Sequence, residues 1–441
     1  MDTEPDTIST GLHEVAKLAK RAPDLAFTTL GHHLTVDALR VAFSGTRRDG
    51  AAGVDGQTAA GYEEHLEENL QSLLNRAKSG TYQAPPVRRT YIPKANGQLR
   101  PIGIPTLEDK VLQRAVVTIL EAIYEQDFLD CSYGFRPRRS AHQALRALRE
   151  ALGRGRWVLE VDIQSFFDSI DHGHLRSFLD RRVRDGMIRR LIGKWMNAGV
   201  MEEGRVHHPE AGTPQGGVIS PLLANVFLHY VLDEWFAMTV KPRLRKEARL
   251  IRYADDFVIV FQSEQDARRV CEVLPKRFAR FGLTLHPKKT RLLSFDPPKK
   301  RKGGGDPGSD AGRRTFDFLG FTWYWGRTLK GGMAVKLRTA KNRWARALKS
   351  LTAWCRENRH KPISEQHRKV SEMLRGHYQY YGVTFNYLLL KCFLDKAKRA
   401  WRTWLSRRGR KGSMPWERFV RLLKRHPLPT PRIRVSIFPT R

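Results

Sequence analysis

The spacing of apolar residues divides the chain into a helical first part, a mixed middle and a helical end. Apolar positions recur at helical spacing in 34–43 and 62–74, and again in 107–124 and 141–152. Between and after these segments, short apolar runs rich in β-branched residues predict strands. From about Thr339 the pattern is helical once more, with aromatic residues among many Lys and Arg. This order of elements predicts an α+β fold with an antiparallel sheet.

One predicted hairpin carries two adjacent aspartates. The apolar runs 250–252 and 257–261 flank the segment 253–256, which contains Asp255 and Asp256, and they predict two antiparallel strands joined by a tight turn. Adjacent carboxylates repel each other and make a poor structural turn, but hard divalent cations prefer such oxygen ligands. An ordinary solvated turn is the alternative interpretation.

A further strand, predicted at 158–163, adds a third carboxylate. With the two-residue period of a strand, Glu160 and Asp162 lie on one face and the apolar residues on the other. We expect Asp162 to lie beside the aspartate hairpin in one sheet, where three carboxylates could hold two Mg²⁺ ions roughly 3.5–4 Å apart. A half-exposed strand with solvated acids is the alternative.

A second hairpin is predicted from the extended segments 85–94 and 98–105. Prolines inside both segments favour edge or irregular strands. Lys94 and Arg100 project near one tip of this hairpin. Basic side chains there would suit a clamp for a triphosphate, and an ordinary solvated hairpin is the other interpretation.

The segment 211–217 is rich in glycine and precedes a predicted helix that runs from Ser220 to about Phe236. Ser220 is the expected N-cap, and Pro221 is the expected first helical residue. The two glycines ahead of this helix leave the backbone open to a close substrate, although a flexible linker fits the same pattern.

After a basic, glycine-rich stretch at 297–308, which predicts a disordered insertion, the pattern returns to strand at 316–324. The last part, 401–441, carries twelve Lys and Arg residues against the single acid Glu417. This imbalance exceeds what a solvated face needs and favours contact with a nucleic-acid backbone. Some of the interleaved aromatic residues belong to the core, and the others could stack on unpaired bases.

The whole chain is strongly basic, with 79 Lys and Arg against 45 Asp and Glu and a formal net charge of +34. Such an excess repels itself unless a polyanion neutralises it, so nucleic acid is the expected partner and a membrane surface the weaker alternative. No stretch approaches the roughly 18 apolar residues of a membrane span. The acidic start without an apolar core predicts no secretory signal.

The four cysteines, Cys131, Cys271, Cys355 and Cys392, lie far apart in the sequence. No Cys-x-x-Cys pair occurs, so the sequence predicts neither a zinc site nor a disulfide framework. We therefore expect a reducing, cytoplasmic compartment. A chain of 441 residues with 41% hydrophobic content can bury a large core that is divided into subdomains.

Taken in order, the motifs of this chain resemble those of the reverse transcriptase–maturase proteins encoded by bacterial group II introns. The resemblance runs from roughly Leu34 to the C-terminus, and its specificity comes from the number of motifs in the right order. No match to a His-Asn-His endonuclease with cysteine pairs occurs, so we expect a member without that domain. The motifs are YIPK (91–94), LRPIGIP (99–105), CSYGFRP (131–137), VDIQSFF (161–167), TPQGG (213–217), YADD (253–256), LHPKKT (285–290), FLGF (318–321) and RGHYQYY (375–381).

The resemblance implies a right-hand polymerase fold with fingers, a palm built on an antiparallel sheet, a thumb, and a helical, basic C-terminal region. The implied parts are an N-terminal helical extension of the fingers at 1–80, fingers and palm at 81–335, the thumb and maturase region at 336–400, and a basic nucleic-acid-binding tail at 401–441.

The resemblance also implies the site residues. Asp162, Asp255 and Asp256 would be catalytic and would bind two Mg²⁺ ions, with Mn²⁺ as a substitute and the Ile163 carbonyl as a further ligand. Phe167 would exclude ribonucleotides by meeting their 2′-hydroxyl. The remaining residues that bind the dNTP would be Lys94, Arg100, Gln215, Gly216 and Lys289, with the adjacent Lys288 as an alternative to Lys289.

The implied partners are a group II intron RNA, as template and ribozyme, a DNA primer or target, and dNTPs, with no membrane and a cytoplasmic, nucleoid-associated location in a bacterium. The expected function is RNA-directed DNA synthesis with maturase-assisted splicing and retrohoming. A domesticated reverse transcriptase in phage defence or CRISPR adaptation is one alternative, and a splicing-only maturase is another. Phe167 opposes an RNA-dependent RNA polymerase. The expected nucleic-acid contacts are Arg375, His377, Tyr378, Arg407, Arg408, Arg410 and Lys411.

Overall fold

The structure, a computed structural model, divides the chain into two compact units, each built from several segments. The boundaries expected for fingers, palm, thumb and tail stay a prediction. The first unit comprises Met1–Ser140, Leu159–Ile259 and Gln265–Leu292, and the second comprises Ala141–Val158, Val260–Glu264 and Leu293–Arg441. The residues described are 10–93, 99–202, 205–207, 216–298, 315–328, 330–408 and 414–438.

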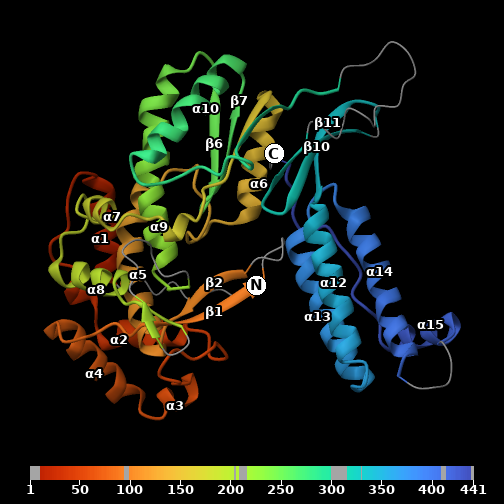
Figure 1. The fold of residues 1–441 in the computed structure, drawn as a ribbon, viewed down its shortest axis with the longest axis horizontal. Helices are drawn as coiled ribbons and strands as arrows, with labels where there is room; N and C mark the ends of the chain where they lie inside the picture. The colour runs from red at the N-terminus through yellow and green to blue at the C-terminus, as the bar shows by residue number, and fades with distance from the viewer. Residues whose placement is uncertain are drawn as a thin grey trace. The chain divides into compact units, whose positions relative to one another are not determined.

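The first unit begins with helices, as the apolar spacing predicts (Figure 1). Its long central helix is α5 (Leu107–Asp127), against which α1 (Thr10–Arg21) and α2 (Val36–Ser44) pack. The Thr106 hydroxyl caps α5 by accepting a hydrogen bond from the Asp109 amide, which satisfies one of the free amides at the helix start. α7 (His172–Leu179) and α8 (Gly186–Met196) belong to the same unit.

The helix predicted over 62–74 is in fact two helices, α3 (Ala59–Glu63) and α4 (Leu66–Ser79). At His65 the backbone leaves the helical region, with φ −127° and ψ 42°, so the two helices cannot be continuous. α4 ends at Gly80, whose φ of 83° is left-handed and is adopted by glycine without strain.

The second predicted hairpin forms as β1 (Val87–Pro93) and β2 (Leu99–Ile104), which pair antiparallel. They belong to a sheet of order β2-β1-β4-β5, completed by β4 (Val200–Glu202) and β5 (Arg205–His207). β2 is an edge strand, as its proline predicts, whereas β1 lies between β2 and β4. Only the first two residues of β1 pair with β4, so Pro93 at its other end interrupts no hydrogen bond on that side.

The sheet of the aspartate hairpin has the order β6-β7-β3-β8 and lies mainly in the first unit. β6 (Ala248–Tyr253) and β7 (Asp256–Phe261) are the predicted hairpin, and β3 (Trp157–Val161) lies directly beside β7. β8 (Arg291–Ser294) borders β3 on its other side. The sheet order therefore confirms that the strand leading to Asp162 lies next to the hairpin.

Two helices of the first unit pack against this sheet. Phe278 of α10 (Glu264–Ala279) stacks on Phe257 of β7, with 6.0 Å between ring centroids. α9 (Ser220–Leu228) contacts β6 through a hydrogen bond between Asn225 and Arg252. The packing of apolar helix faces on buried strands forms the core around the hairpin.

The helix that starts with α9 continues to Val240 through the π-helical stretches His229–Asp233 and Phe236–Val240. The prediction that Ser220 is its N-cap is wrong, because Ile219 is the N-cap and Ser220 is the first helical residue. The Ile219 backbone is already near the helical region, at φ −79° and ψ −22°, so the helix starts one residue earlier than expected.

The second unit holds a sheet of order β11-β10-β9. The strand predicted at 316–324 is in fact two strands, because Leu319 and Gly320 both have positive φ and turn the chain back on itself. The third strand, which follows them in sequence, was not predicted. The strands are β9 (Phe316–Phe318), β10 (Phe321–Arg327) and β11 (Met333–Thr339).

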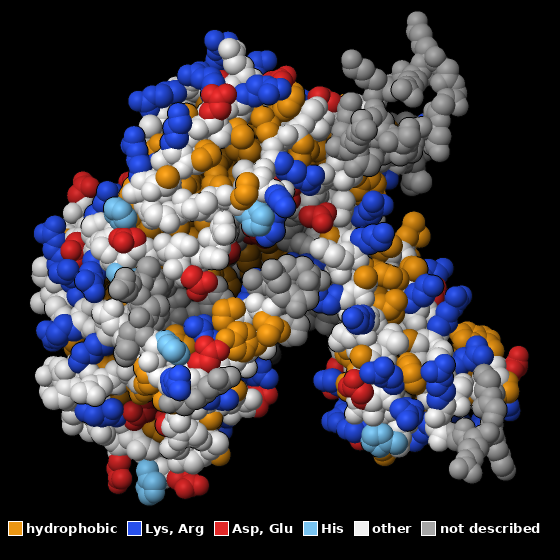
Figure 2. Space-filling model, viewed as in Figure 1, with side chains coloured by type: hydrophobic (Ala, Val, Ile, Leu, Met, Phe, Trp, Pro, Cys, Tyr) orange, Lys and Arg blue, Asp and Glu red, His pale blue; other side chains and the backbone are white. Residues whose placement is uncertain are grey.

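The rest of the second unit is mainly helical, as the sequence predicts, and Figure 1 shows α12, α13 and α14 side by side. These helices enclose an apolar core that includes Trp401, and on the face drawn in Figure 2 Lys and Arg side chains are spread over their surface. In the described parts of the chain, no helix has the length and apolar character of a membrane span. The helices are α6 (Ala141–Arg154), α12 (Lys341–Glu357), α13 (Ile363–Tyr381), α14 (Tyr387–Ser406) and α15 (Trp416–Arg425).

Candidate active site

The turn between β6 and β7 carries Asp255 and Asp256. Asp255 is half-buried and Asp256 is exposed. Ala254, the residue before Asp255, is left-handed with φ 57°, which is uncommon for a residue other than glycine. Such a backbone persists only where surrounding contacts impose it, so the position of Asp255 depends on what lies behind the turn.

Asp162 directly follows β3, next to this hairpin. A neighbouring segment fixes its backbone: the His286 amide donates to the Asp162 carbonyl at 2.8 Å, and the Gln164 amide donates to the Thr284 carbonyl at 2.9 Å. These two hydrogen bonds flank Ile163 and leave its carbonyl outside the pairing. The carbonyl is therefore an oxygen that a ligand near Asp162 could use.

Asp162 and Asp255 lie close enough for the charge of Asp162 to act on Asp255. Burial raises the pKa of Asp255 above its ordinary value, and the charge of Asp162 raises it further. A hydrogen bond from its own amide and the charges of Arg100 and Arg252 lower this pKa only in part. Repelling carboxylates in a half-buried site are a donor set that a divalent cation would neutralise.

Among the side chains that the structure describes, no group of three or more His, Cys, Asp or Glu is arranged to hold a metal ion. The arrangement does bring Asp162 and Asp255 together, and it leaves Asp256 exposed beside them. Metal binding by these three aspartates and by the Ile163 carbonyl therefore stays a prediction.

Lys289 contacts the site directly, because its Nζ donates to the Asp162 Oδ2 at 2.9 Å. The pairing of Ile163 with Leu285 holds the chain that leads to this lysine beside Asp162. The Lys289 side chain is 59% exposed, and an ion pair so open to water contributes little stability. Lys289 can therefore exchange Asp162 for another anion, such as a phosphate.

Phe167 lies in a short 3₁₀ helix, Phe166–Asp168, that follows the left-handed residue Ser165. Its half-buried ring packs edge-on against the buried ring of Phe166, with 5.4 Å between centroids. The Phe166 ring thus restricts the rotation of the Phe167 ring, while part of the Phe167 ring stays accessible to solvent. This is the arrangement that a steric gate for a sugar would need.

Gly216 has φ 117°, and a Cβ at this position would collide with the Gly103 carbonyl oxygen of β2. Only glycine allows the segment to pass so close to β2. Arg100 is an exposed residue of β2, and its charge acts on Asp255. Lys94 and Gln215, the other predicted dNTP contacts, lie outside the described residues.

Two predicted nucleic-acid contacts, His377 and Tyr378, are buried in the helical core of the second unit. The His377 ring stacks on Phe393 with 4.0 Å between centroids, and burial lowers the pKa of His377 to about 4. This histidine is therefore uncharged near neutral pH and faces away from solvent. Both residues act as core packing in this structure, so their position does not support the prediction that they contact nucleic acid.

The other predicted contacts lie at the surface or outside the described residues. Arg375 is exposed on α13. Arg407 is exposed and lies over the Trp404 ring, 4.7 Å from its centroid. Arg408 donates to backbone carbonyls of the loop between α12 and α13. Arg410 and Lys411 lie outside the described residues, and the role of all these residues stays a prediction.

Three buried polar side chains behind the aspartate turn were not predicted from the sequence. They are Arg252 in β6, Asn225 in α9, and Asp233 in the π-helical stretch that follows α9. The signal for them is a polar residue inside an otherwise apolar run, since such residues are seldom fully buried unless they are paired. The sequence does not show which of these residues pair.

Known proteins with sequences similar to this chain indicate its family. Residues 92–323 match the family described as "Reverse transcriptase (RNA-dependent DNA polymerase)". Over 242 residues the chain is 40% identical to the Group II intron-encoded protein LtrA of Lactococcus lactis subsp. cremoris, which covers 54% of this chain and 40% of that protein. Over 238 residues it is 40% identical to Protein YkfC of Escherichia coli (strain K12), which covers 47% of this chain and 62% of that protein.

A plant protein shows a weaker similarity. Over 178 residues the chain is 30% identical to Nuclear intron maturase 2, mitochondrial, of Arabidopsis thaliana, which covers 31% of this chain and 24% of that protein. The chain thus spans less than two thirds of the length of each of these three curated relatives. The α+β polymerase fold with a helical C-terminal region is confirmed. Since the family match covers more than half of the 441 residues and includes Asp162, the aspartate hairpin and Lys289, the chain belongs to the reverse transcriptase family.

Proposed function

We propose that this protein is an RNA-directed DNA polymerase that acts with a group II intron RNA, which it copies into DNA and helps to splice. The observation that carries the proposal is the meeting of Asp162, after β3, with Asp255 of the adjacent hairpin, in a chain that belongs to the reverse transcriptase family. The intron RNA is proposed because relatives of the chain are named as a group II intron-encoded protein and an intron maturase.

The carboxylates fit a divalent cation, because the repulsion between Asp162 and Asp255 is only partly offset by nearby arginines. We assign Asp162, Asp255 and Asp256 as ligands of two Mg²⁺ ions, or of Mn²⁺ in their place, with the Ile163 carbonyl as a further ligand. When bound, such ions activate the primer 3′-hydroxyl and neutralise charge on the triphosphate.

The surrounding side chains would bind and orient the nucleotide. Arg100, whose charge already acts on Asp255, would bind the triphosphate. Lys289 would leave its exposed pair with Asp162 and move to the phosphates, where its ammonium could donate a proton to the leaving pyrophosphate. Phe167 would meet the sugar and exclude a 2′-hydroxyl, and Gly216 would leave room for the nucleotide.

Replacing Asp255 by Asn tests the site. The variant removes one charge and little volume, so we expect primer extension on an RNA template to fall by at least about a thousandfold, because metal-based stabilisation of several kcal/mol is lost. RNA binding, measured by gel shift, should stay near the wild-type level. Glu160→Gln is the matched control: it neutralises a carboxylate of β3 that pairs with Arg291 at 2.7 Å, and it should extend primers normally. Normal extension by Asp255→Asn would refute the assignment.

The splicing role has a separate test. The helices of the second unit carry exposed basic side chains, among them Arg375 and Arg407, that could bind RNA without any part in polymerisation. We expect Asp255→Asn to support splicing of the cognate precursor RNA as well as the wild type does. RNA that copurifies with the wild-type protein identifies the precursor, and a protein that copies RNA but copurifies with no intron would favour a domesticated reverse transcriptase instead.

A further inference from the structure

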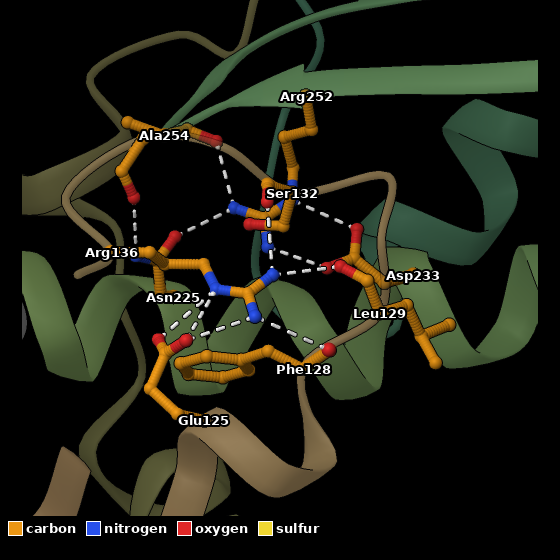
Figure 3. Close-up of polar contacts among 10 residues, drawn as sticks. Glu125, Phe128, Leu129, Ser132, Arg136, Asn225, Asp233, Arg252 and Ala254 are labelled. Carbon is orange, nitrogen blue, oxygen red and sulfur yellow. Dashed lines mark hydrogen bonds and ion pairs between the residues drawn. The ribbon is translucent and has the colours of Figure 1, made fainter. Parts of the chain in front are cut away.

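Arg252 lies directly behind the turn that carries Asp255, and its side chain is fully buried. Figure 3 shows its guanidinium between three groups. Nη1 donates to the Ala254 carbonyl at 3.1 Å and to the Asn225 Oδ1 at 2.8 Å. Nε and Nη2 donate to the two carboxylate oxygens of Asp233, the first of them at 2.8 Å. One side chain therefore joins the turn to α9 and to the π-helical stretch after it.

The burial of the charged Arg252 side chain needs an explanation, because moving an ion pair from water into the protein interior costs free energy. Burial by itself would lower the pKa of Arg252, but the charge and hydrogen bonds of Asp233 outweigh it, so the pKa is raised and Arg252 stays charged. A buried pair of this kind is often no more stable than apolar residues of the same volume. Besides this pair, Arg252 makes a directional bond to the Ala254 carbonyl, which links the arginine to the turn.

The hydrogen bond from Arg252 to the Ala254 carbonyl acts on Asp255 through one planar peptide group. The Ala254 carbonyl and the Asp255 amide belong to the same planar peptide group. A hydrogen bond that fixes the carbonyl therefore fixes the direction in which the chain enters Asp255. Ala254 needs this support, because its φ of 57° is strained for a residue with a Cβ.

A second element holds the turn from the other side. The Asn225 Nδ2 donates to the Gly134 carbonyl at 2.8 Å, and a Cβ on Gly134 would collide with the Ala254 amide nitrogen. The chain before Gly134 pairs with the backbone of Arg252: the Arg252 amide donates to Cys131, and the Tyr133 amide donates to Arg252. The Asn225 side chain, which accepts from Arg252, thus also holds the segment 131–134 that packs on the turn.

We propose that Arg252 is a positioning residue for DNA synthesis: it holds the peptide between Ala254 and Asp255, while Asp233 and Asn225 hold the arginine. The inference rests on the proposed function, because Asp255 must bind metal for its position to matter. Arg252 acts on the site through the turn, and its loss should therefore weaken metal binding and catalysis beyond any loss of stability.

Arg252→Lys tests this directly, because lysine keeps the charge but cannot bond Asp233 through two nitrogens and reach the Ala254 carbonyl at the same time. We expect Mn²⁺ affinity, measured by electron paramagnetic resonance of the free ion, to fall about tenfold. We expect kcat for primer extension to fall about a hundredfold, the effect of a misplacement of about 1 Å, with little change in KM for dNTP. Hydrogen exchange of the peptide 250–257 should become faster.

Arg182→Lys is the matched control. Arg182 is another buried arginine of the first unit; it pairs with Asp127 at 2.8 Å and donates to backbone carbonyls near α1. Its replacement should cost stability but leave Mn²⁺ affinity, kcat and exchange of the peptide 250–257 at wild-type values below the unfolding temperature.

The inference is overturned if Arg252→Lys loses as much stability as Arg182→Lys yet binds Mn²⁺ and extends primers like the wild type. Should Arg252→Lys fail to fold, Asn225→Ala decides, since it leaves the pair of Arg252 with Asp233 but removes both the acceptor of the Arg252 Nη1 and the donor to the Gly134 carbonyl. Unchanged Mn²⁺ affinity and kcat in that variant would overturn the inference. A wild-type protein that binds Mn²⁺ but extends no primer would instead refute the proposed function, and the Mn²⁺ and exchange measurements would still test Arg252.

Discussion

The aspartate turn of the first unit and the helices of the second unit are stabilised in different ways. Behind the turn lies buried charge, in the pair of Arg252 with Asp233, next to a left-handed Ala254. The helices share an apolar core in which Trp401 makes a single polar bond, from its Nε1 to the Gln366 Oε1 at 3.0 Å. Behind the turn, directional hydrogen bonds hold one peptide group in place. In the second unit, apolar packing only has to hold the helices together.

The difference predicts how each region responds to change. Small changes behind the turn should harm metal binding and catalysis more than stability, because a shift of about 1 Å is enough to misplace Asp255. Changes in the helical core of the second unit should lower its stability before they affect RNA binding. The reason is that the exposed basic side chains of these helices do not depend on any single contact in the core. The following experiments test this contrast, beginning with the largest effect.

Trp401→Ala should cause the largest loss of stability. The ring is fully buried, it packs against Phe419, and its removal leaves a cavity and takes the donor away from Gln366. We expect a cost of about 3–5 kcal/mol, measured by urea unfolding, and unchanged Mn²⁺ affinity of the folded protein. Trp401→Phe is the control and should cost less. Weaker Mn²⁺ binding by folded Trp401→Ala would mean that the two regions are not independent.

Gly134→Ala should have the next largest effect, and on catalysis rather than stability. The added Cβ would collide with the backbone of Ala254, so the turn must shift. We expect kcat for primer extension to fall about a hundredfold. Gly193→Ala is the matched control, since it adds the same methyl group in α8 of the same unit, where no atom outside the local helix backbone lies within 4 Å. Equal activity of the two variants would show that the turn tolerates the displacement.

The site could be predicted from the sequence where short-range patterns are enough. Alternation of apolar and polar residues placed Asp162 at the end of a strand, and the apolar runs around Asp255 marked the hairpin. The side chains that accept from Arg252, Asp233 and Asn225, could not be predicted as its partners, because they lie 19 and 27 residues away and neither spacing is a property of a helix or strand. A buried arginine in an apolar strand shows that a partner exists but not which one.

In the helical part, two sequence patterns lead to different expectations. His377 and Tyr378 are predicted as nucleic-acid contacts because they lie in the motif RGHYQYY (375–381), which resembles the maturase region of the family. The spacing from Val370 and Leu374 places both on the buried face of α13, three or four residues apart. Helical periodicity therefore indicates their burial, whereas the motif does not, because core aromatics and surface arginines share one helix.

Asp109 allows a test with pH, in a part of the first unit away from the turn. Burial raises the pKa of Asp109 to about 6, although hydrogen bonds from Tyr82 and from Trp195, the latter at 3.0 Å, oppose the shift. The folded protein then holds this proton more tightly than the unfolded chain, so the stability that the group contributes is complete below about pH 4 and is lost as the pH rises through about 6.

Asp109→Asn cannot titrate, so it should gain about 1 kcal/mol relative to the wild type between pH 5 and pH 7. Urea unfolding of both proteins at the two pH values measures this gain. The kcat ratio of variant to wild type should stay constant over the same range, because this carboxyl lies outside the turn. A stability difference that does not change with pH would contradict the raised pKa.

Gly376→Ala should have the smallest effect and the opposite sign. Gly376 is exposed in a middle turn of α13, and no atom outside the local helix backbone lies within 4 Å of the Cβ position. Alanine loses less backbone freedom on folding, so we expect urea unfolding to show a gain of about 0.5–1 kcal/mol. Primer extension should be unchanged. If RNA binding instead falls while stability rises, a ligand must approach α13 at the glycine next to Arg375. RNA binding by this face of the second unit would then require close shape complementarity, as strictly as catalysis requires the exact position of the turn.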